Sequence, residues 1–278
     1  MKKSINIGVF PASEPYEKAF PALKAAGFDA VELNMLADRQ ASASLWRGAD
    51  AAELAAVRKL ASDNGLEITG VVTDELWRNK LSSSDAAERG RAVDAVRALI
   101  SSAAALGSDS VLVVPGVAEA DMDYLRAMDN VRCSFEILCP EAASAGVVLA
   151  LENVWNKFFI SPVEIRDFVD SFPGGSVGAY LDLGNMCKWS YPQHWIQVLG
   201  KRIHRIHVKG YNTDTNTFCM LLEGNIDWGA AMNALDAAGY DGYMTAELWG
   251  NDDPYETIKS ISADMSAILA LSESGKKQ

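Results

Sequence analysis

Short apolar runs alternate with amphipathic segments along most of the chain. The segments between the runs carry apolar residues three and four positions apart, which predicts helices. Several of these helices end in "AAG", "DNG", "ALG" or "SAG", where the glycine suits a helix C-cap. The runs themselves are rich in β-branched residues and are predicted as strands over residues 5–10, 30–35, 67–73, 110–116, 147–154, 177–184, 203–210 and 243–249.

This alternation of strand and helix is typical of parallel βα units. The strands read as continuous apolar runs, as expected when helices or a core cover both faces. Eight units in 278 residues indicate an α/β protein with a (β/α)8 TIM barrel, which typically uses about 250 residues. An open doubly wound sheet is the alternative, but the first strand runs into FPASEPY and lacks a glycine-rich phosphate turn. We expect a single domain over residues 1–278, with a polar tail at about 272–278.

Composition and charge narrow the range of partners. The chain is 49% hydrophobic and 22% charged, as is ordinary for a soluble protein, and its formal net charge is -12. This acidity argues against nucleic-acid binding. No window approaches the length of a membrane span, and the N-terminal MKKSINIGVF is too short in its apolar part for a secretion signal. We expect a cytoplasmic protein with neither nucleic acid nor membrane as a partner.

One carboxylate at the end of a buried strand poses a physical problem. Glu152 follows the apolar run VVLAL, and an ionised carboxylate there needs a partner, a proton or access to water. In a TIM barrel, catalytic groups lie at the C-terminal ends of strands. The fifth to eighth predicted strands carry ligand-type residues at comparable depth near these ends: Glu152, Asp182, His207 and Glu247.

Three carboxylates and one imidazole suit a divalent cation such as Mn²⁺, Mg²⁺, Co²⁺ or Zn²⁺, and the lack of thiolate disfavours a structural zinc site. Such a cation would let buried carboxylates stay ionised. Arg205 and Lys209 provide an alternative, because they could pair with the carboxylates and leave no metal.

Five segments carry a family resemblance: ALENVWNKF, YLDLGNMCKW, IHRIHVKGY, LLEGNIDW and TAELWG. In this order along the chain they resemble the xylose-isomerase-like TIM-barrel family of sugar and sugar-phosphate isomerases and epimerases. The similarity is greatest to its ketose 3-epimerase and hexulose-phosphate isomerase branch. The resemblance implies one divalent metal, with Mn²⁺ favoured, and a small sugar or sugar phosphate as partner. It also allows a homo-oligomer.

The resemblance further implies a mechanism. Glu152, Asp182, His207 and Glu247 match the family's metal ligands, and Glu152 and Glu247 match its catalytic pair. One glutamate would remove a proton next to the carbonyl of a ketose or ketose phosphate, giving an enediolate that the metal stabilises. The other would return a proton on the opposite face.

Substrate contacts are implied at Glu32, Asn185, Lys209, Trp155 and Trp249. Glu32 would bind a substrate hydroxyl or only bond to a neighbouring loop. The two tryptophans would line a wall for the carbon face of a sugar, or simply pack. Asn185 stands where many family members have histidine.

Charged loop residues leave open whether the substrate is phosphorylated. Arg78 and Lys80 are candidate phosphate contacts, although exposed loop cations usually do nothing specific. The segment 211–224 lacks an arginine that related epimerases often have there.

Three other functions share this scaffold. A lyase that dehydrates a keto-polyol would share the enolisation step. A metal-dependent DNA-repair endonuclease would need several histidines, whereas the chain has three and is acidic. A non-catalytic sugar-binding protein would lack a metal ligand, and all four are present.

Overall fold

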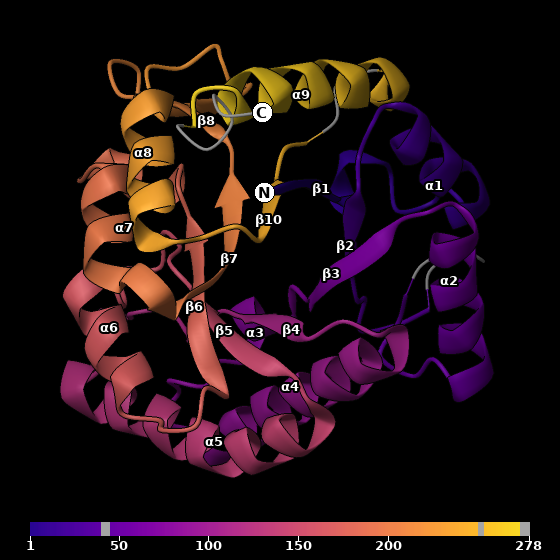
Figure 1. Ribbon diagram of the computed structural model, residues 1–278. Helices are drawn as coiled ribbons and strands as arrows, with labels where there is room; N and C mark the ends of the chain where they lie inside the picture. The colour runs from indigo at the N-terminus through magenta and orange to yellow at the C-terminus, as the bar shows by residue number, and fades with distance from the viewer. Residues whose placement is uncertain (40–44, 250–252, 273–278) are drawn as a thin grey trace.

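The chain folds into a closed barrel of parallel strands surrounded by helices (Figure 1). The computed structural model describes residues 1–39, 45–249 and 253–272. Around the barrel the strands follow the order β1-β10-β7-β6-β5-β4-β3-β2. Their bounds are β1 (Lys2–Asn6), β2 (Ala30–Asn34), β3 (Glu67–Val72), β4 (Ser110–Val113), β5 (Val148–Glu152), β6 (Val177–Asp182), β7 (Ile203–Val208) and β10 (Tyr243–Ala246).

The helices connect successive strands along the outside of the barrel (Figure 1). Gly107, Gly146 and Gly239 follow helices with φ of 80°, 68° and 72°, a left-handed conformation that glycine adopts without strain. The α-helices are α1 (Tyr16–Ala25), α2 (Ala51–Asp63), α3 (Glu75–Arg78), α4 (Ala86–Leu106), α5 (Tyr124–Ala145), α6 (Pro162–Asp170), α7 (Pro192–Leu199), α8 (Trp228–Ala238) and α9 (Pro254–Leu269). Short 3-10 turns are η1 (Ile7–Val9), η2 (Asn185–Lys188) and η3 (Gly200–Arg202).

Pairing between the first and last barrel strands closes the sheet. Lys2 of β1 is in register with Tyr243 of β10, and β1 also pairs in parallel with β2. The predicted (β/α)8 barrel is therefore confirmed, and the open-sheet alternative is wrong. The predicted tail at 272–278 lies outside the described residues except for Ser272.

Two local features differ from the predicted strands. The first strand stops at Asn6 rather than continuing to residue 10, because the Asn6 side chain accepts a hydrogen bond from Gly8 N (2.8 Å) and caps η1. After β7 the chain forms an unpredicted antiparallel hairpin of β8 (Gly210–Asn212) and β9 (Thr217–Cys219).

The barrel interior is polar along its axis, while apolar side chains fill the layer between sheet and helices. Tyr180 on β6 reaches Glu32 on β2 across the barrel, and Arg205 on β7 reaches the Thr69 carbonyl of β3 (3.2 Å). His207, on the same strand as Arg205, is fully buried. Among the described residues, no helix has both the length and the apolar character that crossing a membrane requires.

Candidate functional site

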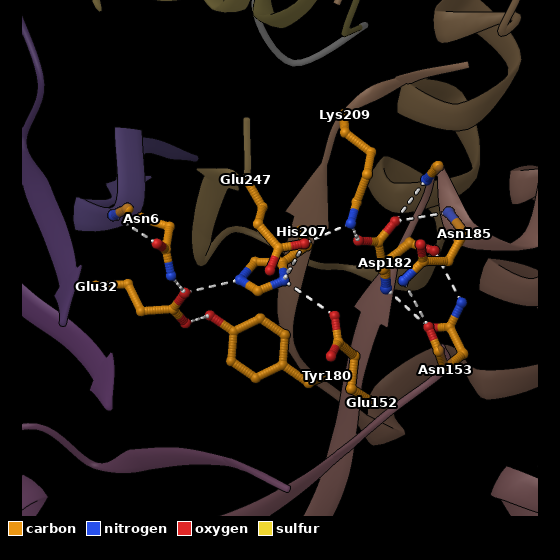
Figure 2. Close-up of polar contacts among 12 residues, drawn as sticks. Asn6, Glu32, Glu152, Asn153, Tyr180, Asp182, Asn185, His207, Lys209 and Glu247 are labelled. Atoms are coloured by element: carbon orange, nitrogen blue, oxygen red, sulfur yellow. Dashed lines mark hydrogen bonds and ion pairs between the residues drawn. The ribbon is translucent and has the colours of Figure 1, made fainter. Parts of the chain in front are cut away.

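Four side chains meet at the C-terminal end of the barrel. Glu152 and Asp182 are the last residues of β5 and β6, His207 lies one residue before the end of β7, and Glu247 directly follows β10. Parallel pairing in register, with Asp182 opposite His207, brings these strand ends to one level. One ligand atom from each of the four lies within 4.8 Å of the others (Figure 2). The predicted metal ligands are thus together in space.

A network of backbone hydrogen bonds fixes Asp182. Its Oδ1 accepts from the backbone N–H of Gly184 (2.8 Å) and Asn185 (2.7 Å). Asn153 donates to the Asp182 carbonyl (2.9 Å) and accepts from its N–H (2.8 Å). Gly184 is required here, because a Cβ would lie 2.4 Å from Lys209 Cγ. Only Oδ2 of Asp182 is left to face the site.

Lys209 joins two of the carboxylates. Its Nζ lies 2.9 Å from Asp182 Oδ2 and also donates to Glu247 Oε2. The contact with Asp182 is an ion pair without hydrogen-bond geometry, and that buried oxygen receives no hydrogen bond. Burial would lower the pKa of Lys209, but the charges of Asp182 and Glu247 raise it well above its ordinary value.

His207 lies among three carboxylates (Figure 2). Its Nδ1 lies 3.1 Å from Glu152 Oε1 and 3.7 Å from Glu247 Oε2. Its Nε2 lies 2.9 Å from Glu32 Oε2. Burial would lower the pKa of His207, yet the charges of Glu32 and Glu247 raise it well above the ordinary value.

The two glutamates of the site differ in their proton affinity. Burial raises the pKa of Glu152 to about 7, although the hydrogen bond with His207 opposes this. Burial acts in the same direction on Glu247, but the charges of His207 and Lys209 outweigh it and lower the pKa of Glu247. Near neutral pH, one glutamate can therefore hold a proton while the other is ionised.

The donor set fits a divalent cation. Metal–ligand bonds of about 2.2 Å allow donors on opposite sides of an ion to lie about 4.4 Å apart, close to the observed 4.8 Å limit. Three carboxylates with one imidazole are ligands that such cations accept. Asp182 Oδ2, buried without a hydrogen bond, is an oxygen that a cation would satisfy.

A cavity of about 510 Å³ opens above these residues. Glu152 and Glu247 line it, as do four of the predicted substrate-binding residues: Asn185, Lys209, Trp155 and Trp249. The Trp155 indole is fixed by its N–H, which donates to the Asn185 carbonyl (2.7 Å), and by stacking on Phe218 (ring centroids 4.6 Å apart). The Asn185 amide is in turn held by the Asn153 carbonyl (2.9 Å).

Glu32 occupies a different place from these four. It is fully buried and does not appear among the described residues that line the cavity. Its Oε2 accepts from Asn6 Nδ2 (2.7 Å) and faces His207, while Tyr180 donates to Oε1. Its partners come from barrel strands rather than from a loop.

The sequence did not lead us to predict roles for Asn6 and Tyr180, or that the Asn153 side chain holds the backbone of Asp182. Asn153 is a polar residue at the end of an apolar run, a signal that was visible in the sequence, whereas Asn6 interrupts the predicted run 5–10 near its start. Tyr180 lies in the middle of β6, and nothing local indicates that its hydroxyl crosses the barrel to Glu32.

Several solved structures have the same fold over nearly the whole chain. An L-ribulose 3-epimerase has a TM-score of 0.82 at 21% identity, covering 99% of this chain and 97% of that one. A D-tagatose 3-epimerase-like protein has a TM-score of 0.79 at 21% identity, covering 97% and 98%. The 3-keto-D-glucoside 4-epimerase YcjR from E. coli has a TM-score of 0.75 at 16% identity, covering 96% and 98%.

Comparison of sequences agrees with the fold. The uncharacterized protein MJ1311 of Methanocaldococcus jannaschii is 26% identical over 176 residues, which cover 60% of this chain and 59% of that protein. The chain thus matches somewhat more than half the length of this curated relative. The family model described as "Xylose isomerase-like TIM barrel" matches residues 20–268. The chain therefore belongs to the xylose isomerase-like TIM barrel family.

Proposed function

We propose that the protein is a divalent-metal-dependent epimerase or isomerase of a ketose. The single observation that supports this most is geometric: the Glu152 and Glu247 carboxyl groups meet at one centre with Asp182 and His207, where one ligand atom of each lies within 4.8 Å of the others. Two carboxyl groups with different proton affinities at one centre suit the removal and return of a proton. The solved structures named above include sugar epimerases, which supports the same reaction class.

Glu152, Asp182, His207 and Glu247 would hold the metal. When bound, Mn²⁺ or a similar cation would polarise a substrate carbonyl and stabilise negative charge that develops on its oxygen. The ionised glutamate takes the proton from the carbon next to the carbonyl, and the protonated glutamate delivers one to the opposite face. Glu152 and Glu247 both line the cavity, so either carboxyl group can face the reacting carbon.

The surrounding residues orient these groups. Lys209 holds the Glu247 carboxylate and offers a positive charge beside the reacting centre. Asn185 and Trp155 line the cavity next to Glu152 and are linked by the Trp155 N–H hydrogen bond, so they would orient the sugar together. Exclusion of water by the aromatic wall would protect an enediolate from wrong protonation.

Deuterium exchange tests the proposal. Purified protein with Mn²⁺ would be incubated with a panel of ketoses in deuterated water, and products and label would be read by NMR. We expect deuterium at a carbon next to the carbonyl together with a new epimer or aldose. Glu141→Gln on the outer helix α5 is the matched control and should behave as the wild type, because Glu141 pairs with Arg97 outside the barrel.

Each glutamate variant gives a sharper result. Glu152→Gln and Glu247→Gln should both lose net epimerisation, yet one of them should still exchange the proton that the remaining glutamate removes. If the main product is a sugar that has lost a hydroxyl group, the protein is instead a keto-polyol dehydratase. Absence of exchange from every ketose at saturating Mn²⁺ would show the proposal to be wrong.

A further inference from the structure

The charge of the cavity narrows the substrate class, provided that the proposed function holds. Lys209 is the one cationic side chain among the described residues that line the cavity, and it is already paired with Asp182 and Glu247. The lining also includes the carboxylate of Asp74. A phosphate or carboxylate on the substrate would find no cation among these lining residues that is free to pair with it.

The cations closest along the chain to the cavity wall already have partners. Arg78 pairs with Asp74 (2.7 Å), and Lys80 pairs with Glu119 (2.6 Å). Lys188 is exposed and lies over the Trp155 ring, with its Nζ 4.2 Å from the ring centroid. The Trp155 ring lines the cavity, whereas Lys188 does not.

The place where TIM barrels often bind phosphate is also occupied by a carboxylate side chain. Barrels that bind phosphate often use the loops after the seventh and eighth strands and a helix N-terminus there. Here Asp253 caps α9 and accepts from the backbone N–H of Tyr255 (2.9 Å) and Glu256 (3.3 Å). Residues 250–252, which precede it, contain neither Lys nor Arg in the sequence.

We infer that the substrate is an uncharged ketose, carrying neither phosphate nor carboxylate. Its carbonyl end would lie at Glu152 and Glu247. Its carbon chain would run along the apolar and aromatic wall, where Trp77, Trp155 and Trp249 present ring surfaces. Tryptophan rings suit the C–H face of a neutral sugar, whose hydroxyl groups stay at the polar rim.

A matched pair of ketoses tests this inference. The kcat/KM for solvent deuterium exchange would be measured for a ketohexose and for the same ketohexose carrying a 6-phosphate, with Mn²⁺ at fixed ionic strength. We expect the free sugar to be preferred by at least about 100-fold. Asp74→Asn removes a carboxylate from the wall and frees Arg78, so it should narrow the preference by about tenfold. Asp121→Asn, an exposed carboxylate in another loop, should leave the preference unchanged.

The outcomes separate this inference from the proposed function. Exchange that favours the phosphate ester overturns the uncharged-substrate inference but leaves the epimerase proposal intact. If deuterium exchange occurs with neither form and with no other ketose tried, both the inference and the proposed function are overturned. A preference for the free sugar that Asp74→Asn does not narrow contradicts the role of the Asp74 carboxylate.

A separate observation concerns Glu32, whose contacts support a role in positioning His207. The Glu32 carboxylate receives three hydrogen bonds within the barrel, from Asn6, Tyr180 and His207 Nε2. Packing around it is close, because a Cβ on Gly70 would lie 3.3 Å from Glu32 Oε1. The carboxylate is therefore held rigidly at the back of the imidazole.

We infer that Glu32 is a positioning residue that orients His207 through Nε2. Because Nε2–H donates to Glu32, Nδ1 is the ring nitrogen that faces Glu152 and Glu247 and would bind the metal. Carboxylates that hold a ligating histidine in this way typically change metal affinity about 10–100-fold. Tyr180 and Asn6 hold Glu32 in turn, so the network spans four strands of the barrel.

Metal affinity and folding would be measured separately. We expect Glu32→Ala and Glu32→Gln to weaken Mn²⁺ binding, read from free Mn²⁺ by EPR, by about 10–100-fold in protein that retains the wild-type circular dichroism spectrum. Tyr180→Phe should have a smaller effect. Ser110→Ala, at another fully buried barrel position, is the control and should keep the wild-type affinity. If the folded Gln variant binds Mn²⁺ like the wild type, Glu32 is only structural.

Discussion

The two ends of the barrel interior both carry clusters of charge, but the clusters differ in burial and balance. At the N-terminal end, Arg205 pairs with Asp109 and Lys2 pairs with Glu67. The side chains of Asp109 and Glu67 are 57% and 52% exposed. At the C-terminal end the acidic residues are mostly shielded from water and outnumber the cations. The acidic residues are Glu32, Glu152, Asp182 and Glu247, and the cationic ones are His207 and Lys209.

This difference separates structural charge from functional charge. Ion pairs with at least one partner half exposed cost little to form and contribute little to stability, because water screens them. Buried carboxylates in excess of their partners destabilise the empty protein, since desolvation is only partly offset. A chain keeps such an arrangement where perturbed proton affinities or a bound cation serve a purpose.

The largest effect is expected at the buried end from Asp182→Asn. The amide keeps the shape of the side chain but removes the charge of Oδ2, the oxygen that receives no hydrogen bond. We expect loss of bound Mn²⁺ and, with it, of all measurable turnover on ketoses. Elemental analysis after Mn²⁺ incubation measures the first, and the deuterium assay the second. Stoichiometric metal in this variant would place the ion elsewhere.

Glu247→Gln should reduce turnover by about 10²–10⁴-fold, the usual range for removing a positioned acid or base. Because this variant also removes a metal ligand, kcat would be measured at saturating Mn²⁺, with the Mn²⁺ affinity determined alongside. A full recovery of kcat at high Mn²⁺ would show that Glu247 acts only by holding the ion.

The stability of the metal-free protein should fall as pH rises. The pKa of Glu152 is about 7 in the folded chain, above the ordinary 4.5. Its contribution to the free energy of unfolding is therefore complete below pH 4.5 and is lost as pH rises through about 7. His207, whose pKa is also raised, acts in the same direction above pH 6.5. We expect the loss from Glu152 to be on the order of 3 kcal/mol between pH 5 and 8.

Denaturant unfolding at both pH values, with EDTA present, would measure this loss. Glu152→Gln should flatten the pH dependence, because its amide does not titrate. Added Mn²⁺ should stabilise the wild type more at pH 8 than at pH 5, since binding competes with protons. If Glu152→Gln shows the same pH dependence of stability as the wild type, that dependence comes from other groups.

The smallest effect is expected at the exposed end. Asp109→Asn should cost about 1 kcal/mol or less, because Asp109 is half exposed and the Arg205 guanidinium keeps its bonds to the carbonyls of Thr69 and His204. Mn²⁺ affinity and turnover should not change. Thermal unfolding and metal titration of the same sample check both, and a loss of metal binding would mean that the two ends are coupled.

The apolar runs were sufficient to predict the barrel and the four candidate ligands, because parallel strands buried on both faces have a distinct pattern and end at a common level. The hairpin of β8 and β9 was not predicted, since its short strands lack such a run. The position of Glu32 could not be predicted either. Its partners Asn6, Tyr180 and His207 lie on three other strands, and only the closed barrel brings them together.

Barrel closure also sets when the site can exist during synthesis. β10, the strand before Glu247, pairs with β1, so residues 2–5 cannot form this pairing until residues 243–246 have emerged from the ribosome. At about 5–20 residues per second, a nascent chain would spend roughly 5–20 seconds with Glu152 made but Glu247 absent. Metal capture by all four ligands therefore has to follow the synthesis of β10, and a chain truncated before β10 would have an unpaired barrel edge in place of a site.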